Sequence, residues 1–116
     1  MKACVVGKAG VRMTDEKTGE LIEGANLFFF AAKENVEGFF AGKVWVKKAS
    51  RLYNKVMALD TSKPFFAVLE YDIQPGRVVR AVLSDIQVMD EDDYSLLLEN
   101  PHWKEFCESF VFTAAR

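Results

Sequence analysis

The order of hydrophobic periods along the first ninety residues is the feature that most constrains the fold. Short runs rich in β-branched and aromatic residues alternate with clusters of turn formers, which predicts strands. The expected strands are 2–13, 21–33, 39–48, 65–73 and 77–89. Gly7 and Gly10 interrupt the first strand and predict a bend or bulge there. The polar segment 14–20 and the pair Pro75-Gly76 predict hairpin turns.

Between the third and fourth strands the period becomes helical. Leu52, Val56 and Leu59 recur at i, i+4 and i+7 within 49–59, and Ser50 is placed to cap the start of this short helix. Three strands, a helix and two strands would close into a small barrel that leaves no exposed strand edge. We therefore expect a mainly β (α+β) chain: a five-stranded OB-like β-barrel over residues 1–89, with the helix between strands 3 and 4.

Residues 90–116 differ, because their apolar positions have a helical period. Asp92 or Asp93 is placed to cap a helix that ends near Asn100, and Asn100-Pro101 is typical of the start of a second helix. One face of that second helix carries Trp103, Phe106, Cys107 and Phe110. We expect an acidic, aromatic helical extension that packs on the barrel or forms a subunit interface. The interface candidates are Trp103, Phe106 and Phe110.

Composition excludes several classes of protein. The 116-residue chain is half hydrophobic and 28% charged, which suits one folded domain. Its longest apolar run, Leu27–Ala32, is far shorter than the roughly 20 residues that cross a bilayer, and Lys8 follows too soon for a secretion signal. Cys4 and Cys107 lack C-x-x-C spacing and are interpreted as reduced thiols. We expect a cytoplasmic protein with no membrane partner.

No pattern indicates catalysis or metal binding. His102 is the only histidine, neither cysteine has a neighbouring base, and there is no Gly-x-Ser-x-Gly or phosphate-binding glycine loop. The acidic run 90–93 lacks the spacing of a calcium loop, and carboxylates before a helix are explained by the helix dipole. We expect neither an enzyme nor a bound metal or cofactor.

The window 38–59 has the composition of a surface for single-stranded nucleic acid. It holds five basic residues, four aromatic residues and no acidic residue, in a chain of net charge −2. The basic residues are Lys43, Lys47, Lys48, Arg51 and Lys55; the aromatic ones are Phe39, Phe40, Trp45 and Tyr53. Basic side chains track phosphates and bases stack on rings. The acidic excess lies in 90–116, which suits a nucleic-acid binder and equally an ordinary domain with an acidic helix.

Strand alternation sharpens this prediction on the third strand. It puts Val44 and Val46 on one face and Lys43, Trp45 and Lys47 on the other, where a ring can stack a base while two ammonium groups meet phosphates. The alternative is that Trp45 packs beneath the helix or another strand, and the lysines reach past it to water.

The second strand is apolar on both faces. If the barrel interior takes Leu27 and Phe29, then Phe28 and Phe30 remain for the tail helix, a partner subunit or bases, and cover by the tail helix is the simpler interpretation. Near the Pro75-Gly76 turn, one aromatic and one basic residue are further candidates for stacking and phosphate contact. These two residues are Tyr71 and Arg77.

Three stretches carry a resemblance to a known family. They are Gly19-Glu20-Leu21-Ile22-Glu23-Gly24, Lys43-Val44-Trp45-Val46 and Pro75-Gly76-Arg77-Val78-Val79. With the strand order, they make residues 1–89 similar to the small OB-fold single-stranded DNA-binding, helix-destabilising proteins of bacteriophages and mobile elements. The resemblance implies a homodimer or higher oligomer that coats single strands without catalysis, as in DNA replication. The aromatic C-terminal helix departs from the acidic tip of bacterial relatives.

We therefore expect non-catalytic binding of single-stranded DNA or RNA with little sequence specificity. The candidate contacts are Lys43, Trp45, Lys47, Lys48, Arg51, Phe28, Phe30, Tyr71 and Arg77. The main alternative is a protein-interaction module, such as a phage-encoded adaptor or inhibitor, that uses the aromatic strand and the C-terminal helix. A small-molecule-binding barrel is a third possibility, based on the many phenylalanines.

Overall fold

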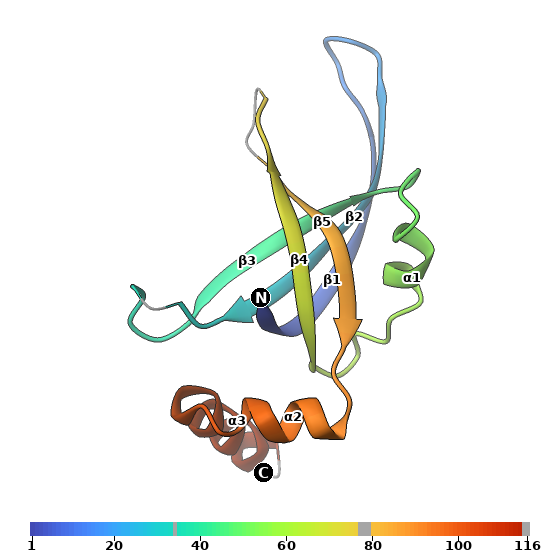
Figure 1. Ribbon diagram of the computed structural model, residues 1–116. Helices are drawn as coiled ribbons and strands as arrows, with labels where there is room; N and C mark the ends of the chain where they lie inside the picture. Colours follow the sequence, from blue (N-terminus) through green and yellow to red (C-terminus); the bar gives the residue numbers. More distant parts are fainter. Residues whose placement is uncertain (34, 77–79, 115–116) are drawn as a thin grey trace.

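Five strands close into a barrel in the order β1-β2-β3-β5-β4 (Figure 1). The strands are β1 (Lys2–Thr14), β2 (Leu21–Ala31), β3 (Phe40–Lys47), β4 (Phe65–Gln74) and β5 (Arg80–Val88). The computed structural model describes residues 1–33, 35–76 and 80–114, with side chains through Glu108. β3 pairs with β5 in parallel and the other neighbours are antiparallel. With α1 (Tyr53–Met57) between β3 and β4, this is the OB-like barrel that the element order predicts.

β1 pairs with two strands, β4 and β2, and its pairing with β2 is irregular near its start. It pairs with β4 as far as Val5 and with β2 out to Thr14. The register with β2 shifts between Val5 and Gly7, which confirms the predicted bulge there. The register runs on unbroken through Gly10, so the expectation of a second interruption at that glycine was wrong.

The barrel interior takes one face of each strand. Leu27 and Phe29 of β2 and Val44 and Val46 of β3 are all buried, as alternation predicts. The buried interior cluster comprises Ala3, Val5, Leu27, Phe29, Ala31, Val44, Val46, Leu52, Val56, Ala67, Leu69, Leu83 and Ile86. The opposite faces of β2 and β3 therefore lie on the outside of the barrel.

Helix α1 is shorter than the predicted 49–59. Its N-cap is Leu52, which makes no side-chain cap bond; the Ser50 hydroxyl oxygen accepts from the Leu52 N–H in the turn before the helix, at 3.2 Å. Leu52 and Val56 are buried and Leu59 packs against the interior cluster, so the predicted apolar face is confirmed. A single helical turn cannot supply its own stability, and tertiary contacts hold it.

Two helices follow the barrel, α2 (Glu91–Leu97) and α3 (Pro101–Ala114). The cap of α2 is Asp90, not Asp92 or Asp93: its carboxylate accepts from the Asp93 N–H at 2.8 Å, while Asp93 accepts from the Asp90 N–H in a capping box. The Asn100 side chain accepts from the His102 N–H at 2.9 Å, as expected of an N-cap before proline.

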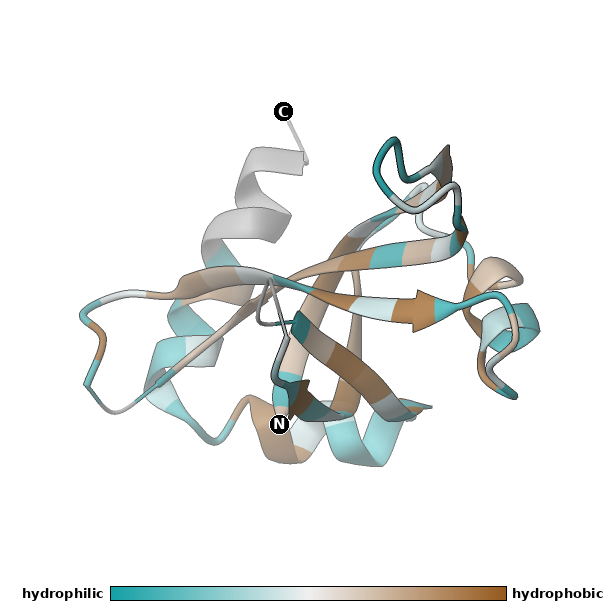
Figure 2. Ribbon diagram, turned by 90° about the horizontal axis from the view of Figure 1, so that it is seen from above, coloured by the Kyte–Doolittle hydropathy of each residue, from teal (hydrophilic) through white to brown (hydrophobic). Residues whose placement is uncertain are grey.

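The β1–β2 and β4–β5 hairpins extend from the end of the barrel opposite the terminal helices (Figure 1). The β1–β2 hairpin, with its hydrophilic tip, extends on the same side as α1 (Figure 2). α2 and α3 cover the other end, where Cys4, Leu97 and Trp103 form a second buried cluster. Within the described part of the chain, none of the helices has the length and apolar character needed to span a bilayer.

Candidate nucleic-acid interface

The outer face of β2 and β3 gathers the polar and aromatic side chains that the sequence analysis singled out on β3. Antiparallel pairing sets Asn26 opposite Trp45 and Phe28 opposite Lys43. Paired residues of an antiparallel sheet share a face, so these four side chains lie together outside the barrel. Lys47, two residues beyond Trp45, is exposed on the same face.

Trp45 points outward, yet only 8% of it is exposed. Its ring lies against Gly24: a Cβ atom added to that glycine would come within 2.7 and 2.8 Å of the ring atoms Cζ2 and Cη2. The guanidinium of Arg80 covers the ring, with Cζ 5.3 Å from the ring centroid. Trp45 therefore belongs to neither buried cluster, and an exposed arginine accounts for part of its cover.

Two hollows adjoin the Trp45–Arg80 pair. The first, about 260 Å³, is lined by residues that include Val11, Met13, Asn26, Lys43, Trp45 and Arg80. The second, about 450 Å³, is lined by residues that include Glu20, Glu23, Trp45, Lys47, Lys48 and Arg80. Because Trp45 and Arg80 line both, the pair stands between a hollow next to Lys43 and one next to Lys47.

The basic window divides into structural and free cations. Lys48 forms an ion pair with Glu23 at 3.0 Å. Arg51 Nη2 donates to the Ser84 carbonyl oxygen at 3.2 Å, and Lys55 Nζ donates to the Ile86 carbonyl oxygen at 2.7 Å. Both of the latter contacts tie the α1 segment to β5.

Two basic residues of the window 38–59, Lys43 and Lys47, differ from the other three. Their side chains form no ion pair and no hydrogen bond with any described residue. They flank Trp45 on the outer face and both are exposed. Alternation along β3 separates the two lysines by about 13 Å along the strand, given a rise near 3.3 Å per residue. The face thus presents two lysines without an ion pair to any described residue, with an aromatic ring between them.

The two outward phenylalanines of β2 have different surroundings. Phe30 lies near the Phe106 ring of α3, with centroids 6.4 Å apart. Phe28 remains 38% exposed and sits beside Lys43 across the strand pair. The tail helix therefore covers one end of the β2 outer face and leaves Phe28 open next to Lys43.

The structure does not place two further candidate nucleic-acid contacts, Tyr71 and Arg77, on the outer face around Trp45. Tyr71 is half-buried and packs against the interior cluster rather than beside Trp45. Arg77 lies outside the described residues.

Two interface candidates of the tail, Trp103 and Phe106, pack on their own barrel. Trp103 is 3% exposed and its ring centroid lies 4.7 Å from that of Phe39 and 5.5 Å from that of Phe66. Phe106 joins the same cluster, with its centroid 4.9 Å from Phe39. The side chain of Phe110 lies outside the described residues. Packing on the barrel, one of the two expected roles of this extension, accounts for Trp103.

The tail also buries both thiols. Burial, and next the nearby Cys107 thiol, raise the pKa of Cys4 to about 11. Burial likewise raises the pKa of Cys107, partly offset by a hydrogen bond with Tyr94. Raised pKa values disfavour the thiolate form of both cysteines at neutral pH. Among the described residues, no cluster of three or more His, Cys, Asp or Glu side chains could hold a metal ion.

Sequence reasoning missed three residues of this face: Gly24, Asn26 and Arg80. Asn26 and Gly24 acquire their roles from the β2–β3 register, and Arg80 from the parallel contact of β5 with β3 next to Trp45. No local pattern encodes these long-range pairings. Alternation on β2 could have placed Asn26 outside the barrel but not opposite Trp45.

Comparison with known proteins adds no relative: no family model, no curated protein sequence and no solved structure matches this chain.

Proposed function

We propose that this chain binds single-stranded nucleic acid, without catalysis, through the outer face of β2 and β3. The observation that carries the proposal is the pair of free lysines, Lys43 and Lys47, on either side of Trp45 with Arg80 over the ring. Cations alternating with aromatic faces suit a strand whose phosphates need charge and whose bases need stacking. No carboxylate is among the described residues that line the hollow next to Lys43.

Stacking on Trp45 requires Arg80 to move aside, and the energies allow it. An exposed cation–π contact is worth about 0.5 to 1 kcal/mol, whereas a base stacked on an aromatic side chain is worth about 1 to 3 kcal/mol. The planar guanidinium of Arg80 can then stack on the same base or meet a phosphate. Phe28 offers a second ring without any displacement, because it is already exposed.

Contacts of this kind read the backbone and the ring faces, so they accommodate DNA and RNA alike. Self-association, phage origin and a role in replication rest on the family resemblance alone and remain predictions.

The test is fluorescence anisotropy of a labelled mixed-sequence strand of about 16 nucleotides, near the upper site size of one OB-fold, with duplex as control. Binding should favour the single strand and weaken with salt. The Lys43→Gln/Lys47→Gln variant should bind more weakly and lower the salt slope by about 1.4, since each phosphate contact on a single strand contributes about 0.7.

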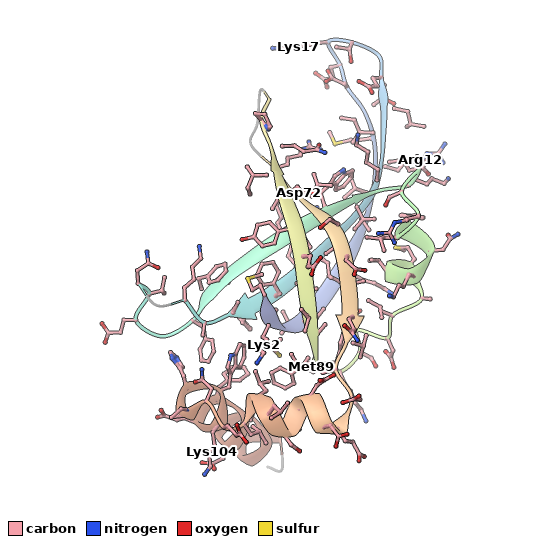
Figure 3. All side chains as sticks on the ribbon, viewed as in Figure 1. Lys2, Arg12, Lys17, Asp72, Met89 and Lys104 are labelled. Atoms are coloured by element: carbon pink, nitrogen blue, oxygen red, sulfur yellow. The ribbon has the colours of Figure 1, made fainter. Side chains whose placement is uncertain are left out.

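The matched control is Lys2→Gln/Lys104→Gln, which removes the same charge from exposed lysines on β1 and α3 (Figure 3). It should keep the wild-type salt slope. If both double variants lost the same affinity for the single strand, the effect would come from net charge alone, and the proposed face would be overturned. Absence of single-strand binding at low salt would overturn the function itself.

A further inference from the structure

The hollow next to Lys47 differs from the rest of the outer face because carboxylates line it beside the cations. We propose that this hollow receives one base of the bound strand, that the base is guanine, and that the Glu20 carboxylate reads its Watson–Crick edge. The inference rests on the proposed function and deepens it, because it makes one position of a sequence-tolerant surface selective.

This hollow has room for a base and a flat wall for it to stack on. Its volume, about 450 Å³, lies within the roughly 300 to 1,000 Å³ of pockets that enclose small molecules. Trp45 and Arg80 line it together, and the guanidinium carbon lies 5.3 Å from the ring centroid. Aromatic rings and guanidinium planes are the surfaces on which the unstacked bases of a single strand pack. The Trp45–Arg80 pair therefore supplies the stacking surface.

Glu20 is on the same face of the sheet as Trp45. It immediately precedes β2, and alternation from Asn26, the partner of Trp45, puts Glu20 on the outer face. Its backbone is held at the base of the hairpin loop. The Glu20 carbonyl oxygen accepts from the Asp15 N–H at 2.8 Å, and the Glu20 N–H donates to Thr18 Oγ1 at 3.2 Å. The carboxylate therefore extends into the hollow from an anchored position.

The two carboxylates among the described lining residues differ in availability. Glu23 is already paired with Lys48, with 3.0 Å between its Oε1 and the ammonium nitrogen. The Glu20 side chain is exposed and forms no ion pair or hydrogen bond with any described residue. Both of its oxygens are thus free to accept. The cations Lys47 and Arg80 line the same hollow and offset the repulsion between this carboxylate and the phosphates of the strand.

A carboxylate with two free oxygens is the complement of guanine. An ionised carboxylate only accepts hydrogen bonds, and it accepts two side by side. The Watson–Crick edge of guanine presents two adjacent donors, the ring N1–H and the amino group. Adenine and cytosine put an acceptor nitrogen next to their amino group, and thymine has a carbonyl oxygen on each side of its N–H. At that edge these three bases give the carboxylate at most one hydrogen bond and set an acceptor beside it.

The hollow next to Lys43 makes no such choice. Its polar lining includes Asn26, whose amide carries a donor and an acceptor. Such an amide pairs with adenine, guanine and thymine alike. The selective position is therefore assigned to the Glu20 side of Trp45.

The experiment compares labelled strands of about 12 nucleotides that are thymidine throughout except at the central base, which is guanine, hypoxanthine, adenine, cytosine or thymine. Hypoxanthine is guanine without the amino group, so it keeps N1–H and loses the second donor. Anisotropy titrations at one low salt concentration give the dissociation constants for the wild type, Glu20→Gln and Glu20→Ala. The matched control is Glu16→Gln, which removes the same charge from an exposed glutamate of the same hairpin loop. Circular dichroism melts establish that each variant is folded.

The wild type should bind the guanine strand about fivefold or more tightly than each of the other four, as a single bidentate base contact allows. Both Glu20 variants should lose this preference, because alanine reads no edge and a glutamine amide pairs with several bases. They should bind the thymine strand at least as tightly as the wild type does, since loss of a carboxylate removes no phosphate contact. Glu16→Gln should keep the preference.

Three results would overturn the guanine pocket and leave the proposed function standing. They are equal wild-type affinity for guanine and any of the other four bases, a guanine preference that survives in a folded Glu20 variant, and loss of the preference in Glu16→Gln as well. Failure of the wild type to bind any of the five strands would overturn both the pocket and the function.

Discussion

Arg80 covers the ring of Trp45, with its guanidinium carbon 5.3 Å from the ring centroid. The two residues meet because β5 runs parallel to β3 and pairs with it at Trp45 and Val82. In the free protein this contact hides an outward-facing aromatic ring from water. A large exposed apolar surface invites association, and the arginine reduces the exposed surface of this ring.

Removal of the Arg80 side chain should uncover Trp45. We expect Arg80→Ala to increase acrylamide quenching of tryptophan fluorescence with a loss of only about 0.5 to 1 kcal/mol in the free energy of unfolding. Trp103 is 3% exposed and contributes a constant background. Arg12→Ala, an exposed arginine on the β1–β2 arm, is the control and should leave quenching unchanged (Figure 3). Identical quenching in both variants would show that Arg80 does not shield the ring.

Gly24 is required by the close approach of its neighbours. A Cβ atom there would lie 2.2 Å from the Val46 carbonyl oxygen and inside contact distance of the Trp45 ring. Because the carbonyl belongs to the paired strand and cannot swing away, Gly24→Ala should cost about 1 to 3 kcal/mol or more of stability and shift Trp45 fluorescence. Gly10→Ala should be nearly neutral in the same urea titration, since the nearest atom is Met57 Cε at 4.0 Å.

Burial of the Cys4 thiol predicts a loss of stability in alkaline solution. The folded-state pKa of about 11 exceeds the ordinary value of 9.0, so between these pH values the unfolded chain releases a proton that the folded chain retains. The free energy of unfolding is therefore at its full value below pH 9 and falls as pH rises to 11, by on the order of 2 kcal/mol for this group.

Urea titrations at pH 8 and pH 10.5 measure this effect. Cys4→Ala should show a smaller decline than the wild type, because the shifted group is gone. The remaining decline has a source in Cys107 and Tyr94, whose pKa values are also raised by burial. The attribution to Cys4 fails if the variant and the wild type lose the same free energy between the two pH values.

Lys8 holds the C-terminal end of α1. Its ammonium donates to the Met57 carbonyl oxygen at 2.6 Å and to the Leu59 carbonyl oxygen, and both acceptors lie where a helix leaves carbonyls unpaired. Lys8→Met keeps the apolar stem and removes both bonds, at an expected cost of about 1 to 2 kcal/mol.

Hydrogen exchange of residues 53–59 should accelerate in Lys8→Met and be unchanged in Lys17→Met, which alters an exposed lysine at the hairpin tip (Figure 3). Unaltered exchange in both variants would mean that the Lys8 bonds do not hold this helix, and that burial of Leu52 and Val56 suffices together with the contacts of Arg51 and Lys55 to β5.

Much of the fold could be predicted from local pattern. The period-2 runs of β2 and β3 identify Leu27, Phe29, Val44 and Val46 as the interior face, because a strand exposes alternate residues to opposite sides. The helix caps were less predictable: several carboxylates compete at the start of α2, and the backbone angle of Asp90 decides among them.

The candidate site, too, could be predicted only in part from the local sequence. Alternation alone puts Lys43, Trp45 and Lys47 on one face, and this much the sequence determined by itself. Burial of the opposite face confirms it.

Only the tertiary structure decided that Asn26 and Arg80 join Trp45 on the outer face of β2 and β3. Chain positions far apart become neighbours only when strand register is set, since one residue of slippage would turn Asn26 inward and a different β5 pairing would remove Arg80 from the ring. The packing of α3 on one end of β2 decided that Phe30 meets Phe106 while Phe28 stays open. Residue type and hydrophobic period can be seen in the local sequence. The set of side chains on the outer face of β2 and β3 depends instead on which strands pair and in which register, and the packing of the whole barrel determines both.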